Sequence, residues 1–94
     1  MITLVWQPAF ERDLKRRLRR DPSLRIDIER ALRQLADDPF HPSLRSHKLK
    51  GKLSGTWACS VAYDLRIIFE PSQNPSTGED ELLLLAIGTH DEVY

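Results

Sequence analysis

Residues 57–69 read WACSVAYDLRIIF, and this stretch determines which kind of fold the chain can adopt. From residue 57 to 63, large side chains alternate with small ones, which is the period-two pattern of a half-buried strand. A tight turn is expected at residues 63–64. Residues 65–69 are then apolar on both faces except at Arg66, a pattern typical of a central strand. The stretch therefore predicts a pair of neighbouring antiparallel strands.

The sequence on either side extends this sheet. Residues 81–87 form another apolar run that predicts a second central strand, and Gly88 ends it. The polar residues 71–80 between the two central strands predict a long hairpin loop. Before the opening stretch, residues 47–53 predict a short strand. Residues 89–94 form a short tail.

The first forty residues have a different period. Residues 2–6 are β-prone, and Pro8 suits the first position of a helix, where its missing N–H has no partner. Apolar residues then recur every four positions up to Leu18, which predicts an amphipathic helix. Asp21 is the expected N-cap of a second amphipathic helix, which should end near residues 37–39.

The predicted order of elements is β-α-α-β-β-β-β in one domain, residues 1–94. The expected fold class is α+β, with the two N-terminal helices packed on one face of a small antiparallel sheet. The residues expected to form the core are Phe10, Leu14, Leu18, Leu24, Ile28, Leu32, Leu35, Ile67, Phe69, Leu83 and Leu85.

The charge of the chain is unevenly distributed. The 94 residues hold 14 Lys and Arg and 14 Asp and Glu, so the formal net charge is zero. Residues 1–52 nevertheless hold 13 basic residues against 7 acidic ones, and residues 53–94 hold 1 against 7. A basic half suggests a polyanionic or acidic partner, and a solvated helix face rich in arginine is the alternative.

Several classes of protein are excluded. The single cysteine, Cys59, rules out an internal disulfide and a zinc site built from cysteines. The longest apolar run, residues 82–87, is far shorter than the roughly 20 residues that span a bilayer. No secretory signal is recognisable at the N-terminus, so we expect a cytoplasmic protein without membrane contact.

Three residues on separate segments could act together on a phosphate: His47, Arg66 and His90. Two histidines and a fixed cation suit RNA cleavage, which needs a base, an acid and a group that stabilises developing negative charge. Tyr94 would share a face with His90 if the tail were helical. The alternative is that both histidines lie on the surface, that Arg66 pairs with a neighbouring carboxylate and that Tyr94 covers the end of the sheet. No metal-ligand spacing is present.

The segments HKLKG (residues 47–51), LSGTWACSVAYDLRIIF (53–69) and LLAIGTHDEVY (84–94) resemble the RelE/ParE superfamily of bacterial toxins, in particular its RelE and YafQ-like branch. The resemblance implies a RelE-like fold and a toxin of a type II toxin–antitoxin system. It further implies an endoribonuclease that cuts mRNA in the ribosomal A site without a metal or other cofactor. In that reaction the 2′-oxygen attacks the adjacent phosphate and leaves a 2′,3′-cyclic phosphate.

The resemblance also implies a catalytic set. The late histidine of the YafQ-like pattern, assigned to proton transfer, corresponds to His90, and the aromatic residue that follows it corresponds to Tyr94. His47 and Asp64 match supporting positions. Arg66 lies where RelE-like toxins have a strand arginine that steadies the phosphate.

The chain departs from the YafQ-like pattern at two positions. It has Ser60 where that pattern has a further histidine, and Leu65 where it has an aromatic residue. The loss of a histidine leaves open which residue is the acid and which the base.

The implied partners are a cognate antitoxin and mRNA on the ribosome, with contacts to 16S rRNA. A toxin–antitoxin complex would bind operator DNA through the antitoxin. Two alternatives keep the fold: a ParE-like inhibitor of DNA gyrase, and a catalytically silent member that only binds antitoxin. The residues expected to contact RNA phosphates are Arg16, Arg17, Arg19, Arg20, Lys48, Lys50 and Lys52.

Overall fold

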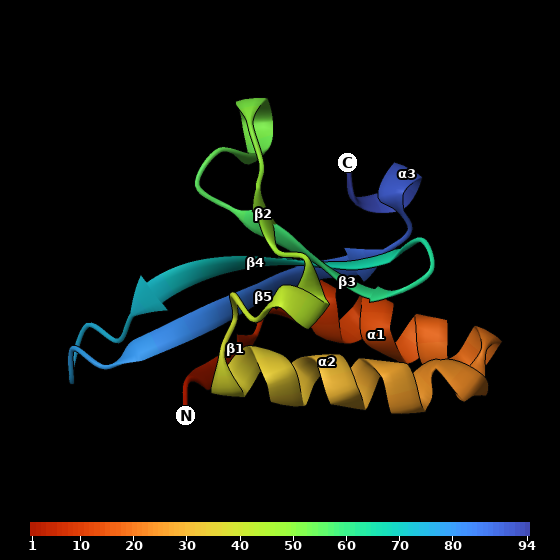
Figure 1. Cartoon of the computed structure of the whole chain (residues 1–94), viewed down its shortest axis with the longest axis horizontal. Coiled ribbons are helices and arrows are strands. Elements are labelled where there is room, and N and C mark those ends of the chain that lie inside the picture. The colour runs from red at the N-terminus through yellow and green to blue at the C-terminus, as the bar shows by residue number, and fades with distance from the viewer.

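The computed structural model describes all 94 residues and places two helices against one face of a five-stranded sheet (Figure 1). The order of the strands in the sheet is β1-β5-β4-β3-β2. The elements are β1 (Thr3–Trp6), α1 (Pro8–Arg20), α2 (Arg25–Asp37), β2 (His47–Lys48), β3 (Trp57–Ala62), β4 (Leu65–Gln73), β5 (Asp80–Gly88) and α3 (His90–Val93). Short 3₁₀ turns lie at Pro22–Leu24, Pro42–Leu44 and Gly51–Leu53.

The helical hairpin forms as predicted, except that α2 begins at Arg25 with Leu24 as its N-cap, so Asp21 is not the N-cap of α2. Pro8 is the first residue of α1, and Asp21 follows the last. The Oδ1 atom of Asp21 accepts a hydrogen bond from the Ser23 N–H at 3.2 Å, which caps the 3₁₀ turn that leads into α2. This capping satisfies a backbone donor that has no partner inside the helix.

The α+β class is confirmed, but the sheet is mixed rather than wholly antiparallel. Strand β1 runs parallel to β5, with Thr3 opposite Glu81 and Trp6 opposite Leu84. The other strand pairs are antiparallel. Both helices and three strands separate β1 from β5 along the chain, so no hairpin turn imposes an antiparallel direction on this pair.

The core lies between the helices and the inner face of the sheet. Most of the predicted core residues are buried there: Phe10, Leu14, Ile28, Leu35, Ile67 and Phe69. Three others, Leu18, Leu24 and Leu32, are only half-buried and pack against this cluster from its edge.

Strand β5 contributes different leucines from those predicted. The buried residues are Leu82, Leu84 and Ile87, so the assignment of Leu83 and Leu85 to the core was wrong. A β-bulge explains the change of phase, because residues 67–69 of β4 face the four residues 84–87 of β5. The extra residue is Leu85, and after it the side chains of β5 alternate in the opposite sense.

Two connections also differ from expectation. Strand β4 continues to Gln73 and β5 begins at Asp80, so the loop between them covers residues 74–79 and is shorter than predicted. The strand expected over residues 47–53 ends at Lys48 and gives way to a 3₁₀ turn. None of the helices has the length and apolarity required to cross a bilayer.

The face of the sheet away from α1 and α2 carries the candidate site. Figure 1 shows the β2–β3 connection and α3 rising from the sheet on this side, next to each other, although they are distant in sequence. His47 lies in β2, which leads into this connection, and His90 is the first residue of α3.

Candidate functional site

Arg66 occupies the middle of the face of the sheet that is away from α1 and α2. Strand β4 is the third of five strands, and its neighbours Ile67 and Phe69 point into the core. Because side chains alternate along a strand, Arg66 points to the opposite face. The register places Ser60 of β3 on one side of it and Gly88 of β5 on the other. Because Gly88 has no side chain, Glu92 and Val93 of α3 can pack over this position beside Arg66.

The guanidinium of Arg66 has no carboxylate partner. Its Nη1 donates to the backbone carbonyl oxygens of Ala62 at 3.4 Å and Leu65 at 3.3 Å. No ion pair joins Arg66 to Asp64, Glu70 or any other acid, so the alternative in which a carboxylate neutralises Arg66 does not hold. A half-buried arginine without a counter-ion favours the binding of an anion.

Helix α3 is only one turn long, and local contacts define where it begins. Thr89 and Glu92 form a capping box: Thr89 Oγ1 accepts from the Glu92 N–H at 3.3 Å, and Glu92 Oε1 accepts from the Thr89 N–H at 2.8 Å. Asp64 Oδ1 accepts a third hydrogen bond, from the His90 N–H at 3.3 Å. These contacts hold the histidine above the turn between β3 and β4.

Gly88 allows α3 to turn back closely over the end of β5. A Cβ atom at this position would lie 3.1 Å from the Cβ of Glu92 and 3.2 Å from a methyl of Val93. Any other residue would therefore push α3 outward, and His90 with it.

The helical tail brings two histidines and a tyrosine together. The rings of His90 and Tyr94 meet edge to face, with centroids 4.3 Å apart. The Tyr94 hydroxyl lies 3.3 Å from His47 Nε2, which connects α3 with β2. The expectation that a helical tail would place His90 and Tyr94 on one face is confirmed.

The hydrogen bonds of His47 define its tautomer. Its Nδ1 lies 3.3 Å from the carbonyl oxygen of Arg45, which can only accept, so Nδ1 carries the proton. Nε2 is then an acceptor for the Tyr94 hydroxyl. Burial raises the pKa of Tyr94 above its usual value, although the positive charge of Arg66 acts in the opposite direction. Tyr94 thus remains a hydrogen-bond donor at neutral pH.

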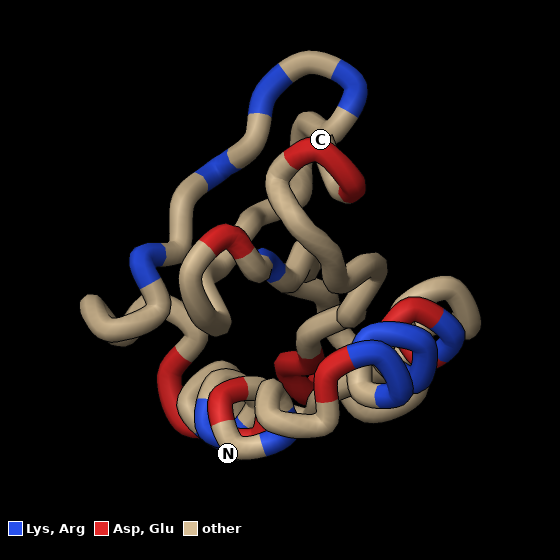
Figure 2. Tube along the Cα trace, turned by 90° about the vertical axis from the view of Figure 1, so that its right-hand side faces the viewer, with Lys and Arg blue, Asp and Glu red and all other residues tan.

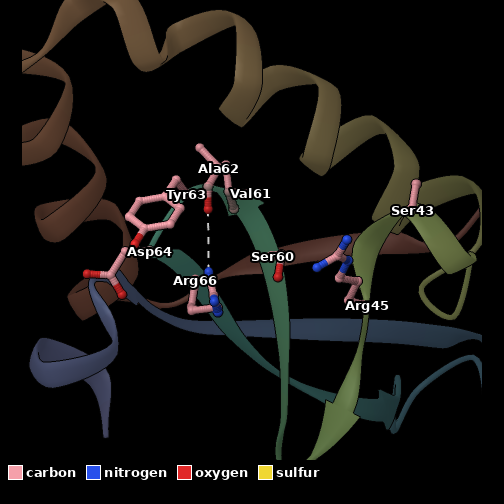
Figure 3. Close-up of a pocket in the computed structure, with 8 residues that line it drawn as sticks. All are labelled: Ser43, Arg45, Ser60, Val61, Ala62, Tyr63, Asp64 and Arg66. Atoms are coloured by element: carbon pink, nitrogen blue, oxygen red, sulfur yellow. Dashed lines mark hydrogen bonds between the residues drawn. The ribbon is translucent and has the colours of Figure 1, made fainter.

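A cleft of about 560 Å³ extends from Asp64 and Arg66 along the edge of β3 (Figure 3). In Figure 3, Asp64 and Arg66 lie toward one end of the cleft and Arg45 lies toward the other, with Ser60 between the two arginines. Beyond Ala58, β2 no longer pairs with β3, which leaves the edge open. The lining residues are Ser43, Arg45, Ser60, Val61, Ala62, Tyr63, Asp64 and Arg66.

The basic residues predicted to contact RNA fall into two groups. The lysines belong to β2 and the β2–β3 connection, on the site's side of the sheet, whereas the arginines belong to α1 (Figures 1 and 2). Lys48 lies over the ring of Trp57, 5.9 Å from its centroid, and Lys50 and Lys52 are exposed without an ion pair.

The arginines of α1 differ from one another in their contacts. Arg16 lies 3.9 Å from Asp13, and Arg17 forms an ion pair with Glu92. Arg19 and Arg20 are exposed and make no ion pair. Of these four arginines, only Arg19 and Arg20 have guanidinium groups without an acidic partner.

Two residues of the site were not identified from the sequence. Glu92 could have been, because Thr-x-x-Glu at residues 89–92 is the signature of a capping box. Arg45 carries no such signal, since its position on the cleft depends on the turn at Pro42–Leu44 and on the short length of β2.

The thiol of Cys59 lies outside this arrangement. Cys59 is buried in the core, and burial raises its pKa to about 12, so it is not a nucleophile at neutral pH. No three His, Cys, Asp or Glu side chains lie close enough to hold a metal ion.

The family described as bacterial toxin of type II toxin-antitoxin system, YafQ, matches residues 2–94. No curated protein sequence matches the chain significantly. Among solved structures, a copper-bound mutant toxin from Helicobacter pylori is 27% identical, with all of both chains covered and a TM-score of 0.71.

Two further structures are similar in fold. The YoeB/ParE toxin from Agrobacterium tumefaciens is 24% identical over 95% of this chain and 99% of that one, with a TM-score of 0.77. The DinJ-YafQ complex from E. coli contains a chain that is 16% identical, covering 100% of this chain and 99% of that one, also with a TM-score of 0.77.

Proposed function

Because the chain belongs to the YafQ family of toxins from bacterial type II toxin–antitoxin systems, we propose that it is an endoribonuclease that cleaves mRNA on the ribosome. The 2′-oxygen attacks the adjacent phosphorus, the bond to the 5′-oxygen of the next nucleotide breaks, and a 2′,3′-cyclic phosphate remains. The observation that carries this proposal is the grouping of His90, Tyr94 and His47 beside the unpaired guanidinium of Arg66.

Two proton transfers accompany the reaction, and two histidines are present to make them. A base must remove the proton of the 2′-hydroxyl, and an acid must protonate the departing 5′-oxygen. We assign the main transfer to His90, because its imidazole is exposed and a histidine side chain can both accept and release a proton. His47 presents the unprotonated Nε2, so it supports the reaction as an acceptor of hydrogen bonds.

The other three residues act on charge and position. Arg66 is always protonated, and its planar array of donors suits a phosphate that gains negative charge in the transition state. The exposed part of the Tyr94 ring would stack on the face of a base and hold the backbone for in-line attack. Asp64 accepts a hydrogen bond from the His90 N–H and so acts as a positioning residue.

The ribosome and the mRNA present a dense array of phosphates to this face. Lys48 lies next to His47 in β2, and Lys50 and Lys52 follow in the β2–β3 connection, so they are the first candidates for contacts with mRNA and 16S rRNA. Arg16, Arg19 and Arg20 on α1 would contact phosphates on another part of the ribosome. Arg17 already forms an ion pair with Glu92. This activity would take place in the cytoplasm.

We further expect a cognate antitoxin to bind and inhibit the toxin, and the complex to bind operator DNA through the antitoxin. The structure of DinJ with YafQ supports this proposal by analogy of fold. An antitoxin with acidic segments would complement the surplus of basic residues in positions 1–52.

The test is to add the purified protein to ribosomes translating a defined mRNA and to map new 5′ ends. We expect cleavage within the A-site codon, with a 2′,3′-cyclic phosphate on the upstream fragment. Cleavage should persist after a metal chelation that leaves the ribosome intact. A parallel assay of gyrase supercoiling covers the ParE-like alternative. Inhibition of gyrase without any mRNA cleavage would overturn the proposal, and inactivity in both assays would favour a silent, antitoxin-binding member.

A further inference from the structure

The cleft beside the proposed catalytic group contains a second arginine that the reaction scheme does not use. Arg45 and Arg66 both line it, and Ser60 lies between them (Figure 3). Arg45 is exposed, and its guanidinium makes neither an ion pair nor a side-chain hydrogen bond. Two positive side chains therefore face one concave space, and neither of them forms an ion pair.

Asp64 is the only carboxylate on the cleft, and it is already engaged. It accepts the hydrogen bond from the His90 N–H at the end of the cleft nearer α3. The rest of the lining comes from serine hydroxyls, small apolar side chains and the open edge of β3. A cleft of this composition attracts an anion that can accept hydrogen bonds from both guanidinium groups.

The backbone at Arg45 is unusual for its residue type. Its φ of 51° and ψ of 40° lie in the left-handed region, which non-glycine residues seldom adopt. The conformation follows the 3₁₀ turn at Pro42–Leu44 and directs the chain into β2, so that Arg45 reaches the cleft while its carbonyl oxygen holds His47. The same residue thus connects the cleft with the proposed catalytic histidine pair.

The volume and rim of the cleft fit a nucleotide better than a bare ion. A space of about 560 Å³ lies within the range of pockets that bind small organic ligands. Tyr63, at the turn between β3 and β4, also lines it and is fully exposed. An exposed aromatic ring beside arginines is the combination that binds single-stranded nucleic acid by stacking and charge.

We propose that this cleft is a subsite for the nucleotide next to the cleaved bond, and that Arg45 binds the phosphate of that nucleotide. The inference rests on the proposed function, because Asp64 and Arg66 belong both to the cleft and to the catalytic group. Arg45 is then a binding residue outside the reacting atoms. Its loss should weaken the binding of substrate and leave the chemical step almost unchanged.

The experiment measures binding and cleavage separately. A short single-stranded RNA with 2′-O-methyl groups at every position cannot be cut, and its affinity is followed by fluorescence anisotropy over a series of salt concentrations. Arg45→Ala should raise Kd on the order of tenfold and reduce the slope of log K against log salt by about 0.7, the contribution of one phosphate on a single strand. Arg45→Lys should restore part of the affinity.

Arg33→Ala is the matched control, because Arg33 is an exposed arginine on α2 that makes no ion pair. It should bind RNA as the wild type does. Alanine keeps the Cβ of Arg45, so Arg45→Ala adds no backbone strain, and equal melting temperatures would verify its fold. On programmed ribosomes, Arg45→Ala should raise KM with kcat within about twofold of the wild type.

The outcomes separate this proposal from the proposed function. Wild-type cleavage with an Arg45→Ala variant of unchanged Kd, salt slope and KM would overturn the subsite and leave the nuclease standing. Binding of the uncleavable RNA that depends on Arg45, with no cleavage of mRNA by the wild type, would overturn the nuclease and keep Arg45 as a phosphate-binding residue of an RNA-binding cleft. An Arg45→Ala variant whose kcat alone falls would also contradict the subsite.

Discussion

The carboxylate of Glu92 accepts a hydrogen bond from the guanidinium of Arg17, although 75 positions separate the two residues. The pair joins α3, which carries His90, to the last turns of α1. The side chain of Arg17 is only 18% exposed, so its charge is partly withdrawn from water. The capping hydrogen bond to Thr89 and, to a smaller degree, Arg17 lower the pKa of Glu92. We therefore infer that Arg17 and Glu92 form a frame for α3, that is, an ion pair that holds this helix in position.

The first prediction tests this frame with a double-mutant cycle on single-turnover cleavage. Arg17→Ala and Glu92→Gln should each reduce kcat several-fold, because α3 loses a contact that orients His90. The double variant should be little worse than either single one, since both changes break the same pair.

Arg33→Ala is the control, as it removes an exposed arginine of α2 that has no ion pair and no proposed contact with RNA. It should leave kcat unchanged. Additive effects of Arg17→Ala and Glu92→Gln, accompanied by a flatter salt dependence for Arg17→Ala alone, would instead assign Arg17 to RNA binding.

The second prediction concerns the bulge in β5. Leu84 is fully buried in the core, whereas Leu83 is only half-buried on the other face. Leu84→Ala should lower the free energy of unfolding by about 2–5 kcal/mol, and Leu83→Ala by about 1 kcal/mol or less. Urea denaturation of the two variants measures the difference. Equal losses of unfolding free energy would contradict the burial of Leu84 in preference to Leu83.

This pair of leucines shows what the sequence could and could not reveal about the fold. The apolar stripes of the helices could be predicted because Phe10 and Leu14, and likewise Ile28 and Leu35, recur at helical spacing with polar residues between them. Residues 82–85 are four consecutive leucines, so they contain no period-two signal from which the phase of β5 could be read. The phase is set by pairing with β4, which is a tertiary effect.

Part of the candidate site could also be predicted from the sequence. The grouping of His90 and Tyr94 follows from local helix geometry, and the sequence contains that information. The position of Arg45 depends on where β2 ends and on how the preceding 3₁₀ turn closes. No single-sequence pattern records those features, so the cleft became visible only in the structure.

The third prediction follows from the burial of Cys59. Its pKa is about 12 in the folded protein, against 9.0 for an ordinary thiol. A raised pKa means that the stabilising effect is fully present below pH 9 and is lost as the pH rises from about 9 to 12, because the unfolded chain loses its proton first. Urea midpoints of the wild type should therefore fall more steeply above pH 9 than those of Cys59→Ala. Parallel curves for the two proteins would contradict the prediction.

The fourth prediction separates the hydroxyl of Tyr94 from its ring. Tyr94→Phe keeps the contact with His90 and removes only the hydrogen bond to His47 Nε2. It should reduce kcat by a few-fold and change the pH dependence of cleavage, because Nε2 of His47 becomes free to bind a proton. Tyr94→Ala should lose considerably more, since the stacking surface disappears. If Phe and Ala were equally defective, the hydroxyl rather than the ring would be the important group.

The last prediction concerns the two residues at the centre of the proposed reaction. His90→Ala and Arg66→Ala should each reduce single-turnover cleavage by roughly 10²-fold or more, the range for losing a general acid–base or a group that stabilises transition-state charge. Arg66→Lys should recover little, because an ammonium group cannot reproduce the planar pair of donors. Both alanine variants should fold and co-purify with the antitoxin, since His90 is exposed and Arg66 faces away from the core. Wild-type cleavage by His90→Ala would show that another residue transfers the proton, and His47→Ala would then be the variant to examine.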